Sequence, residues 1–450
     1  MKKSLDDLPL SRFHKRIAVV AAGGPFCDGY LLGIIAIAIP SIVMDLNLTP
    51  TETGVLGAAS LAGMFVGGLV FGPLTDRIGR KLMYVLNLVI FVLASVAQFF
   101  FDGFIALSIL RLVMGMALGA DYPIATTMAT EFLPKKARGP ILSSLVLCLW
   151  AGYLLSFIVG YFIAQLGSHM WEFTLATAAI PALVFLALRM GIPESPRWLL
   201  SVGRTDEARA IVEKHLGPEA DFEDLQQNTR LASKGKGLSS ILELFRRGYG
   251  KVLFFCGVFW ACQVAPSFAI KTFQPQLLTS LNLDNPLLAS IGITSFTLIG
   301  TALGMFVINA TGRRKLLLAT YVASTAALFL LATPASTVVI FTIGFFIMFT
   351  VSEAAGSCLQ FVYPNEIFPT DLRATGVGLA TSISRIGSAA GTFALPMTIT
   401  SMGATGALLI AGAISAFGLI VSYFLAPETK NMALDAKAKP ASDPVNTSTR

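Results

Sequence analysis

The sequence is short of charge. Only 13% of its 450 residues are Asp, Glu, Lys or Arg, whereas 54% are hydrophobic, and a soluble globular chain carries about 25% charged residues. This deficit excludes a secreted domain, a nucleic-acid-binding protein and an ordinary cytosolic enzyme. The net charge of +7 does not restore a nucleic-acid partner, because the basic residues lie in short connections between apolar runs rather than on one continuous face.

Groups that would support enzyme chemistry are also lacking. The five cysteines all fall inside apolar runs without metal-ligand spacing, so we expect them to be small packing residues. The three histidines fall in predicted loops, which leaves no imidazole for proton transfer at membrane depth. The sequence has no nucleotide-binding motif and no nucleophile–base arrangement. We therefore expect no enzymatic activity and no metal or organic cofactor.

The sequence instead contains many long apolar runs. A hydrocarbon core about 30 Å thick needs roughly 20 apolar residues per helix. Twelve runs meet this requirement and predict an all-α polytopic membrane protein whose main partner is the lipid bilayer. The predicted spans are 17–43, 54–75, 82–101, 104–132, 140–166, 171–190, 252–282, 286–310, 316–333, 336–364, 373–400 and 404–426.

The distribution of Lys and Arg predicts the orientation. If both termini are cytoplasmic, the outer loops contain no Lys or Arg, and every basic residue except Arg111, Lys271 and Arg385 lies at or near the cytoplasmic side. Such an asymmetry indicates cytoplasmic N- and C-termini. The first apolar run is too long for the hydrophobic region of a signal peptide, so we expect it to be a retained span.

Composition divides the chain into four predicted parts. Residues 1–190 and 251–426 form two six-helix bundles, and residues 191–250 form a cytoplasmic linker with short amphipathic helices. Residues 427–450 form a polar cytoplasmic tail.

Three landmarks repeat between the two predicted bundles, at offsets of 233, 235 and 234 residues. The matches are Asp76–Lys81 with Asn309–Arg314, Glu131–Pro134 and Arg138 with Glu366–Pro369 and Arg373, and Pro193–Ser195 with Pro427–Thr429. Parallel repeats of this kind place a substrate site at their interface near the membrane midplane, where rocking of the halves gives alternating access.

These segments also carry a family resemblance. The chain resembles the major facilitator superfamily and looks most like bacterial inner-membrane metabolite transporters of its sugar-porter branch. The segments that carry the resemblance are Gly72–Lys81, Arg111–Gly115, Glu131–Gly139, Pro193–Leu199, Pro427–Lys430, GGPFCDGY in helix 1 and GADYPIA in helix 4. The resemblance implies the major-facilitator fold, secondary transport by a monomer, and a proton as the coupling ion.

Six ionisable residues fall at membrane depth, where each costs at least about 2.5–3.5 kcal/mol on insertion scales. They are Asp28, Arg111, Asp121, Lys271, Glu353 and Arg385. Such residues either pair to hold helices together or bind substrate and protons. By resemblance to proton-coupled sugar porters, Asp28 and Arg111 form a pair that responds to protonation. Asp121 is the alternative proton site, because a similar Asp-Tyr-Pro occurs in phosphate–proton symporters.

The expected substrate-binding residues are Tyr30, Trp150, Tyr153, Gln263, Lys271, Glu353 and Arg385. Tyr153 and Phe268 fall where hexose carriers place a sugar-binding Gln and Asn, which puts a hexose in doubt. Lys271 and Arg385 are suited to clamp a carboxylate, although Glu353 is placed to neutralise either one. Trp150 is suited to stack on a ring or simply to pack.

These residues predict a proton symporter that imports a small polar metabolite, with a carboxylate-bearing acid favoured. A neutral sugar or polyol porter and an efflux antiporter are the alternatives, and a transporter-like nutrient sensor is a remote one.

Charges at the cytoplasmic helix ends are predicted to form a gate. Their ion pairs would link helix ends in the outward-facing state, although the basic members would also serve as simple topology determinants. Each ion pair is weak at the water interface, so a network of such pairs is required for any effect on gating. The predicted gating residues are Asp76, Arg80, Glu131, Arg138, Arg313, Arg314, Glu366 and Arg373.

Overall fold

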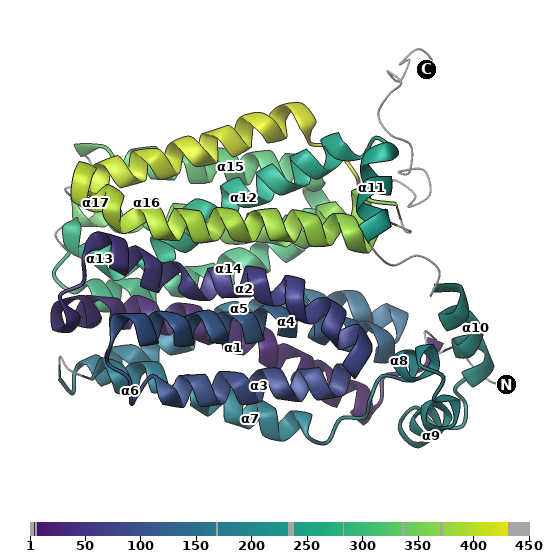
Figure 1. Cartoon of the computed structure of the whole chain (residues 1–450). Coiled ribbons are helices and arrows are strands. Elements are labelled where there is room, and N and C mark those ends of the chain that lie inside the picture. Colours follow the sequence, from purple (N-terminus) through teal and green to yellow (C-terminus); the bar gives the residue numbers. More distant parts are fainter. Residues whose placement is uncertain are drawn as a thin grey trace, which may run out of the picture.

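The computed structural model describes residues 4, 7–167, 170–232, 238–281, 283–334, 338–369 and 372–430. These residues fold into helices α1 to α17, which we divide into an N-terminal half, a linker and a C-terminal half (Figure 1). The N-terminal half consists of α1 (Arg12–Leu46), α2 (Pro50–Ile78), α3 (Arg80–Ala97), α4 (Phe104–Phe132), α5 (Lys135–Ala164), α6 (Trp171–Ala176) and α7 (Ala179–Arg189). The linker holds α8 (Pro196–Ser201), α9 (Thr205–His215), α10 (Phe222–Ala232) and α11 (Leu238–Arg246). The C-terminal half consists of α12 (Gly250–Thr272), α13 (Gln274–Ser280), α14 (Pro286–Thr311), α15 (Arg313–Leu331), α16 (Val339–Ile367) and α17 (Arg373–Leu425).

The helices account for the predicted membrane crossings. Eleven segments are long and apolar enough to cross a bilayer, with α6 and α7 together making one of them. The 53-residue α17 contains two predicted spans, because Gly403 interrupts it with φ of 72° and ψ of 175°. Glycine adopts positive φ readily, since it has no Cβ. Gly403 therefore turns the chain between the last two crossings, and the twelve predicted crossings are all present.

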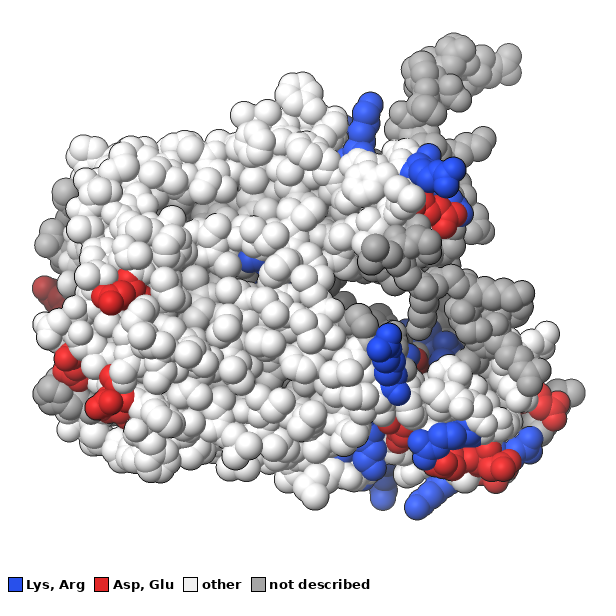
Figure 2. Space-filling view, in the orientation of Figure 1, with Lys and Arg blue, Asp and Glu red and all other residues white. Residues whose placement is uncertain are grey.

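The two halves lie side by side with their long helices roughly parallel (Figure 1). Charged side chains gather at the two ends of the molecule, and the broad band between them is almost free of charge (Figure 2). Lys and Arg are concentrated at the end that carries α8 to α11. The uncharged band has the character of a surface that faces lipid, and the basic end is the cytoplasmic side.

Two expectations about local structure were wrong. The predicted span 252–282 is split into α12 and α13, because Pro275 lies in the first turn of α13 and removes a backbone donor. His14 and His215 lie in helices rather than loops, at the first turn of α1 and the end of α9. Both are still at the cytoplasmic end, and His169 lies outside the described residues.

A carboxylate caps the same helix in both halves. Gly79 and Gly312 end α2 and α14 with φ of 114° and 92°, so α3 and α15 begin without a side-chain cap of their own. Glu194 instead accepts hydrogen bonds of 3.2 and 3.1 Å from the first two backbone N–H groups of α3. Glu428 does the same for α15 at 3.0 and 3.2 Å. The segment after each half thus returns a negative charge to a helix N-terminus, where it is favourable.

We expect Glu428→Gln to lower the midpoint of thermal unfolding of the purified protein. Burial would raise the pKa of the Glu428 carboxyl, but hydrogen bonds from the backbone N–H groups of Lys430, Arg313, Arg314 and Thr429 bring it below its ordinary value. A group with a lowered pKa stabilises the fold above its unfolded-state pKa and loses this effect as the pH falls through the folded-state value. A carboxylate at a helix N-terminus contributes about 0.3–1 kcal/mol, so the loss should be modest at neutral pH and smaller in acid.

The matched control is Glu213→Gln, which removes the same charge from an exposed position on α9. Equal unfolding midpoints for Glu428→Gln and this control at neutral pH would contradict a stabilising role for the cap.

Candidate functional site

A central cavity with a volume of about 60 Å³ lies between the two halves. The N-terminal half contributes Asp28, Leu32, Met64, Val146, Leu149 and Trp150, and the C-terminal half contributes Trp260, Val264, Phe268, Glu353, Ser357, Gln360 and Arg385. Of the predicted substrate-binding residues, Trp150, Glu353 and Arg385 line this cavity, as does the predicted coupling residue Asp28.

The cavity is closed toward the outside by close approach of the halves. At Gly54 of α2, an added Cβ would collide with the backbone carbonyl of Phe393 in α17, and at Gly57 it would lie 2.8 Å from the ring of Phe273. At the opposite, cytoplasmic end the molecule is hollowed between the halves (Figure 2). The structure is therefore inward-facing.

Three ionisable side chains line the cavity from different helices. Asp28 of α1 comes from one half, and Glu353 of α16 and Arg385 of α17 come from the other. Asp28 is buried, and within the described residues its Oδ1 has no hydrogen-bond partner. The cavity wall thus combines a carboxylate with an unused acceptor and a guanidinium from the opposite half.

The expected pair between Asp28 and Arg111 is not formed in this arrangement. Arg111 is fully buried and donates from Nη2 to the backbone carbonyl of Leu31 at 3.2 Å. Its Nε and Nη1 have no partner among the residues that the structure describes. A carbonyl one turn further along α1 therefore takes the place of the expected carboxylate. Arg111 therefore has unsatisfied donors within the described part of the chain, and each unsatisfied buried donor costs about 1–3 kcal/mol or more in free energy.

Asp121 has a different partner from any that we expected. Arg189 of α7 donates to Asp121 through Nη1 at 2.5 Å and Nη2 at 2.7 Å, and both residues are fully buried. Arg189 also donates to the backbone carbonyl of Tyr84 at 2.6 Å and lies 3.5 Å from the centroid of its ring. Gly24 of α1 makes room for this pair, because a Cβ there would collide with Asp121. Asp121 is thus part of a bidentate pair that joins α4 to α7 behind the cavity wall.

Two residues of the buried polar network, Arg189 and Gln360, were not predicted from the sequence. Arg189 was grouped with the cytoplasmic positive charges because it closes an apolar run, yet it is fully buried. Gln360 lies seven residues after Glu353, with Ser357 between them, and all three line the cavity from one face of α16. Spacings of four and seven residues place side chains on one helix face, so this signal was present in the sequence.

Glu353 neutralises one of the two candidate cations. Its Oε2 accepts from the Nζ of Lys271 at 2.7 Å, and both side chains are buried. Lys271 does not line the cavity, and its Nζ lies 3.8 Å from the centroid of the Trp150 ring. The expectation that Lys271 clamps a substrate carboxylate therefore does not hold in this arrangement.

Three other candidates lie behind the cavity wall. Tyr30 donates to Thr177 at 2.9 Å inside the N-terminal half, and Tyr153 donates to the backbone carbonyl of Lys271 at 2.9 Å. Gln263 lines a smaller cavity of about 10 Å³ in the C-terminal half and accepts from Gln360 at 3.1 Å. In this arrangement these residues support the wall, and Gln263 contacts two residues of the central cavity, Gln360 and the backbone carbonyl of Glu353.

The cytoplasmic charges pair inside each half. Arg80 pairs with Glu131, which also accepts from the Ser195 hydroxyl. Arg313 pairs with Glu366 at 3.0 Å, and Thr429 repeats the role of Ser195. These contacts follow the repeat, whereas the predicted pairs between the halves belong to the outward-facing state and stay a prediction.

The other predicted gating residues also have local surroundings. Arg138 donates to the backbone carbonyl of Leu133 at 3.0 Å, and Arg314 donates to that of Tyr423 at 2.9 Å. Arg373 begins α17. The side chain of Asp76 lies outside the described residues.

Comparisons with known proteins agree with this architecture. A family model described as "Sugar (and other) transporter" matches residues 17–438. The protein YaaU of Escherichia coli (strain K12) is 37% identical over 436 residues, which cover 96% of each chain. The inner membrane metabolite transport protein YgcS of the same organism is 36% identical over 432 residues, which cover 96% of this chain and 95% of that protein.

A solved structure confirms the fold. The partially occluded inward-open conformation of the xylose transporter XylE from E. coli superposes with a TM-score of 0.81 at 22% identity. The match covers 94% of this chain and all of that one. It confirms the all-helical membrane fold that the apolar runs predicted and the major-facilitator fold that the resemblance implied. The chain therefore belongs to the sugar (and other) transporter family of the major facilitators, and it is a multi-pass membrane protein that performs secondary transport of a metabolite.

Proposed function

We propose that the protein is a proton symporter that imports a small carboxylate-bearing metabolite across the bacterial inner membrane. The observation that carries this proposal is the pair of charges on the cavity wall. Asp28 faces the cavity from one half with an unused acceptor, and Arg385 faces it from the other. The relatives fit this picture, because they include the niacin transporter NiaP of Acinetobacter baylyi, 28% identical over 413 residues, and niacin is an aromatic carboxylic acid.

In this proposal Asp28 carries the proton and Arg111 responds to it. A buried carboxylate without a partner is costly when it is ionised. Arg111 has unused donors and is held by the Leu31 carbonyl on the same helix as Asp28. A change in the arrangement of α1 and α4 would let Arg111 exchange this carbonyl for the ionised carboxylate. Gain or loss of the proton is then tied to a change of partner, which biases one arrangement of the halves over the other.

Arg385 would bind the carboxylate of the substrate. A guanidinium offers planar, bidentate donors that match a carboxylate. The neighbouring walls are aromatic, with Trp150 from one half and Trp260 and Phe268 from the other. Aromatic side chains supply a large apolar surface and defined ring geometry, so an acid with a flat or apolar body suits this cavity.

A neutral sugar or polyol is the second candidate substrate. Ser357 and Gln360 line the cavity and are suited to hydroxyl groups. An arabinose-proton symporter of Bacillus subtilis (strain 168) is among the relatives, at 26% identity over 459 residues. The two candidates differ in the groups that bind them, because a sugar would use Ser357 and Gln360 of α16 whereas an acid would use Arg385 of α17.

Uptake into proteoliposomes distinguishes these two substrate classes. Labelled nicotinic acid, other small organic acids, xylose and arabinose are offered with and without an external pH below the internal pH. The proposal expects accumulation of at least one acid that requires the pH difference. Accumulation of neutral sugars alone, or accumulation that ignores the pH difference, would refute it.

We expect Asp28→Asn to abolish proton-driven accumulation while exchange of substrate between the two sides continues. Asn has the size of a protonated Asp but cannot release a proton, so the coupled step is lost and binding is retained. The measurement is uptake against a gradient compared with counterflow in the same proteoliposomes. Asp102→Asn, at an exposed position in an outer loop, is the matched control and should behave as the unchanged protein. Persistent accumulation in Asp28→Asn would remove Asp28 from the coupling mechanism.

We expect Arg385→Gln to weaken binding of the acidic substrate about tenfold or more, because a hydrogen bond to a charged group contributes about 1.5–3 kcal/mol. Gln keeps polarity and much of the length. The measurement is the KM for uptake or the Kd for the purified protein, with the exposed Arg246→Gln as the control for loss of a positive charge. An unchanged affinity in a normally folded Arg385→Gln protein would make Arg385 a structural residue.

A further inference from the structure

We propose that Lys271 is a positioning residue that keeps the extracellular side of the transport path closed. It contacts Trp150 in the N-terminal half and Glu353 in the C-terminal half, and we call these contacts of Lys271 the latch. The latch does not depend on the identity of the substrate or of the coupling ion. It rests on the placement of Lys271 along α12, on its two side-chain contacts and on a backbone contact.

Lys271 lies just beyond the extracellular end of the cavity. Trp260, Val264 and Phe268 line the cavity from α12 at intervals of four residues, so they share one helix face. Lys271 follows Phe268 by three residues on this face, and α12 ends at Thr272. The Lys271 side chain is buried, although it does not line the cavity.

The ammonium group of Lys271 contacts both halves of the protein. Its Nζ donates to Glu353 of α16 at 2.7 Å and lies 3.8 Å from the centroid of the Trp150 ring of α5. The first contact stays within the C-terminal half, whereas the second crosses between the halves. A buried cation over a Trp ring is attracted by the negative face of the ring, and desolvation strengthens this attraction. Glu353 therefore holds the ammonium in place, and the ammonium holds Trp150.

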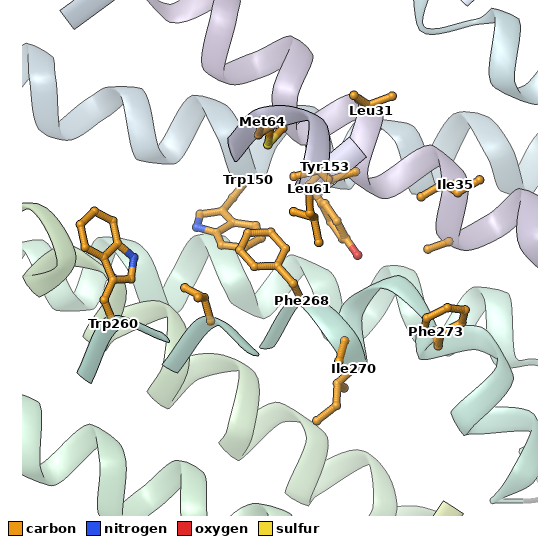
Figure 3. Close-up of a cluster of buried hydrophobic side chains, with 14 of the residues drawn as sticks. Leu31, Ile35, Leu61, Met64, Trp150, Tyr153, Trp260, Phe268, Ile270 and Phe273 are labelled. Atoms are coloured by element: carbon orange, nitrogen blue, oxygen red, sulfur yellow. The ribbon is translucent and has the colours of Figure 1, made fainter. Parts of the chain in front are cut away.

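The backbone of Lys271 makes a second contact between the halves. In a continuous helix its carbonyl would accept from the N–H of residue 275, but Pro275 has none. The carbonyl instead accepts from the hydroxyl of Tyr153 at 2.9 Å. Tyr153 lies one turn beyond Trp150 on α5 and points toward α12 beside Phe268 (Figure 3). Two residues of α5 thus hold one residue of α12.

This arrangement makes closure sensitive to the contents of the cavity. Opening toward the outside requires the end of α12 to separate from α5, which breaks both contacts between the halves. Trp150 and Glu353 line the cavity and Lys271 connects them behind its wall. A substrate that shifts either wall residue therefore acts on the latch. A contact made in one state and lost in the other shifts the equilibrium between them by its own strength.

The strength of the latch can be measured by the accessibility of a buried cysteine from the extracellular side. The reporter is Leu61→Cys in a background that lacks the five native cysteines, because Leu61 is fully buried and lies beside Tyr153 at the closed layer (Figure 3). A membrane-impermeant maleimide is added to spheroplasts, where it reaches the protein only from the extracellular side. The labelling rate then reports the fraction of outward-open protein, and no substrate is needed.

We expect Lys271→Met combined with Glu353→Gln to raise the labelling rate about tenfold or more. The double change removes the cation without leaving an unpaired carboxylate. Lys271→Arg keeps the cation and should restore labelling to nearly the original rate. Trp150→Leu removes the ring but keeps the ion pair, and it should also raise the rate. Lys251→Met, at the exposed cytoplasmic start of the same helix, is the matched control and should change nothing.

The outcomes separate the latch from a purely structural role. Unchanged labelling in both the double variant and Trp150→Leu would overturn the proposal. Equal increases in Lys271→Arg and the double variant would also overturn it, because the charge would then have no part in closure. Trp150→Leu provides the test on its own if the double variant does not fold. Since labelling needs neither substrate nor pH difference, failure here is distinguishable from failure of acid–proton symport.

Discussion

Pairing of charge in a low-dielectric interior is the constraint on which the rest of this structure depends. Two buried pairs satisfy it, Asp121 with Arg189 and Lys271 with Glu353, and each joins different helices of one half. Asp28 and Arg111 satisfy it incompletely, since each has polar atoms without a partner among the described residues. Each of the two pairs holds helices of one half together.

The contacts within the halves and those between them differ in kind. Within each half, a glutamate caps a helix and a second glutamate pairs with the first arginine of that helix, as Glu428 and Glu366 do at α15. Between the halves, closure uses glycines that allow backbones to approach and side chains that meet over short distances. Charged networks join the helices within each half. The smaller set of contacts between halves is what rocking has to break and reform.

The C-terminal half of the site shows how one residue serves more than one purpose. Glu353 is part of the cavity wall and also removes the charge of Lys271 from the cavity. Arg385 lines the same cavity from α17, and Asp28 lines it from the other half. Aromatic walls between the charges restrict which molecular bodies fit.

Much of the architecture follows from the sequence alone, because membrane insertion is governed by local quantities. Length and polarity of each apolar run determine the crossings, and the side on which Lys and Arg lie determines the orientation. The repeat, visible at Gly79 and Gly312 and again at Glu194 and Glu428, likewise indicates two related halves. The position of Glu353 on the cavity wall could also be predicted in part, since Ser357 and Gln360 lie on the same face of α16.

Partners of the buried charges were decided by tertiary structure. Asp121 pairs with Arg189 rather than standing free, and Arg111 meets a carbonyl rather than Asp28, because helix rotation and depth select the nearest group. Lys271 was expected in the cavity and lies behind its wall, since α12 ends one residue later and Pro275 redirects the backbone. Sequence specifies which charges must be buried. Which of them meet depends on angles and distances between helices that are far apart in the chain, and no local pattern encodes these.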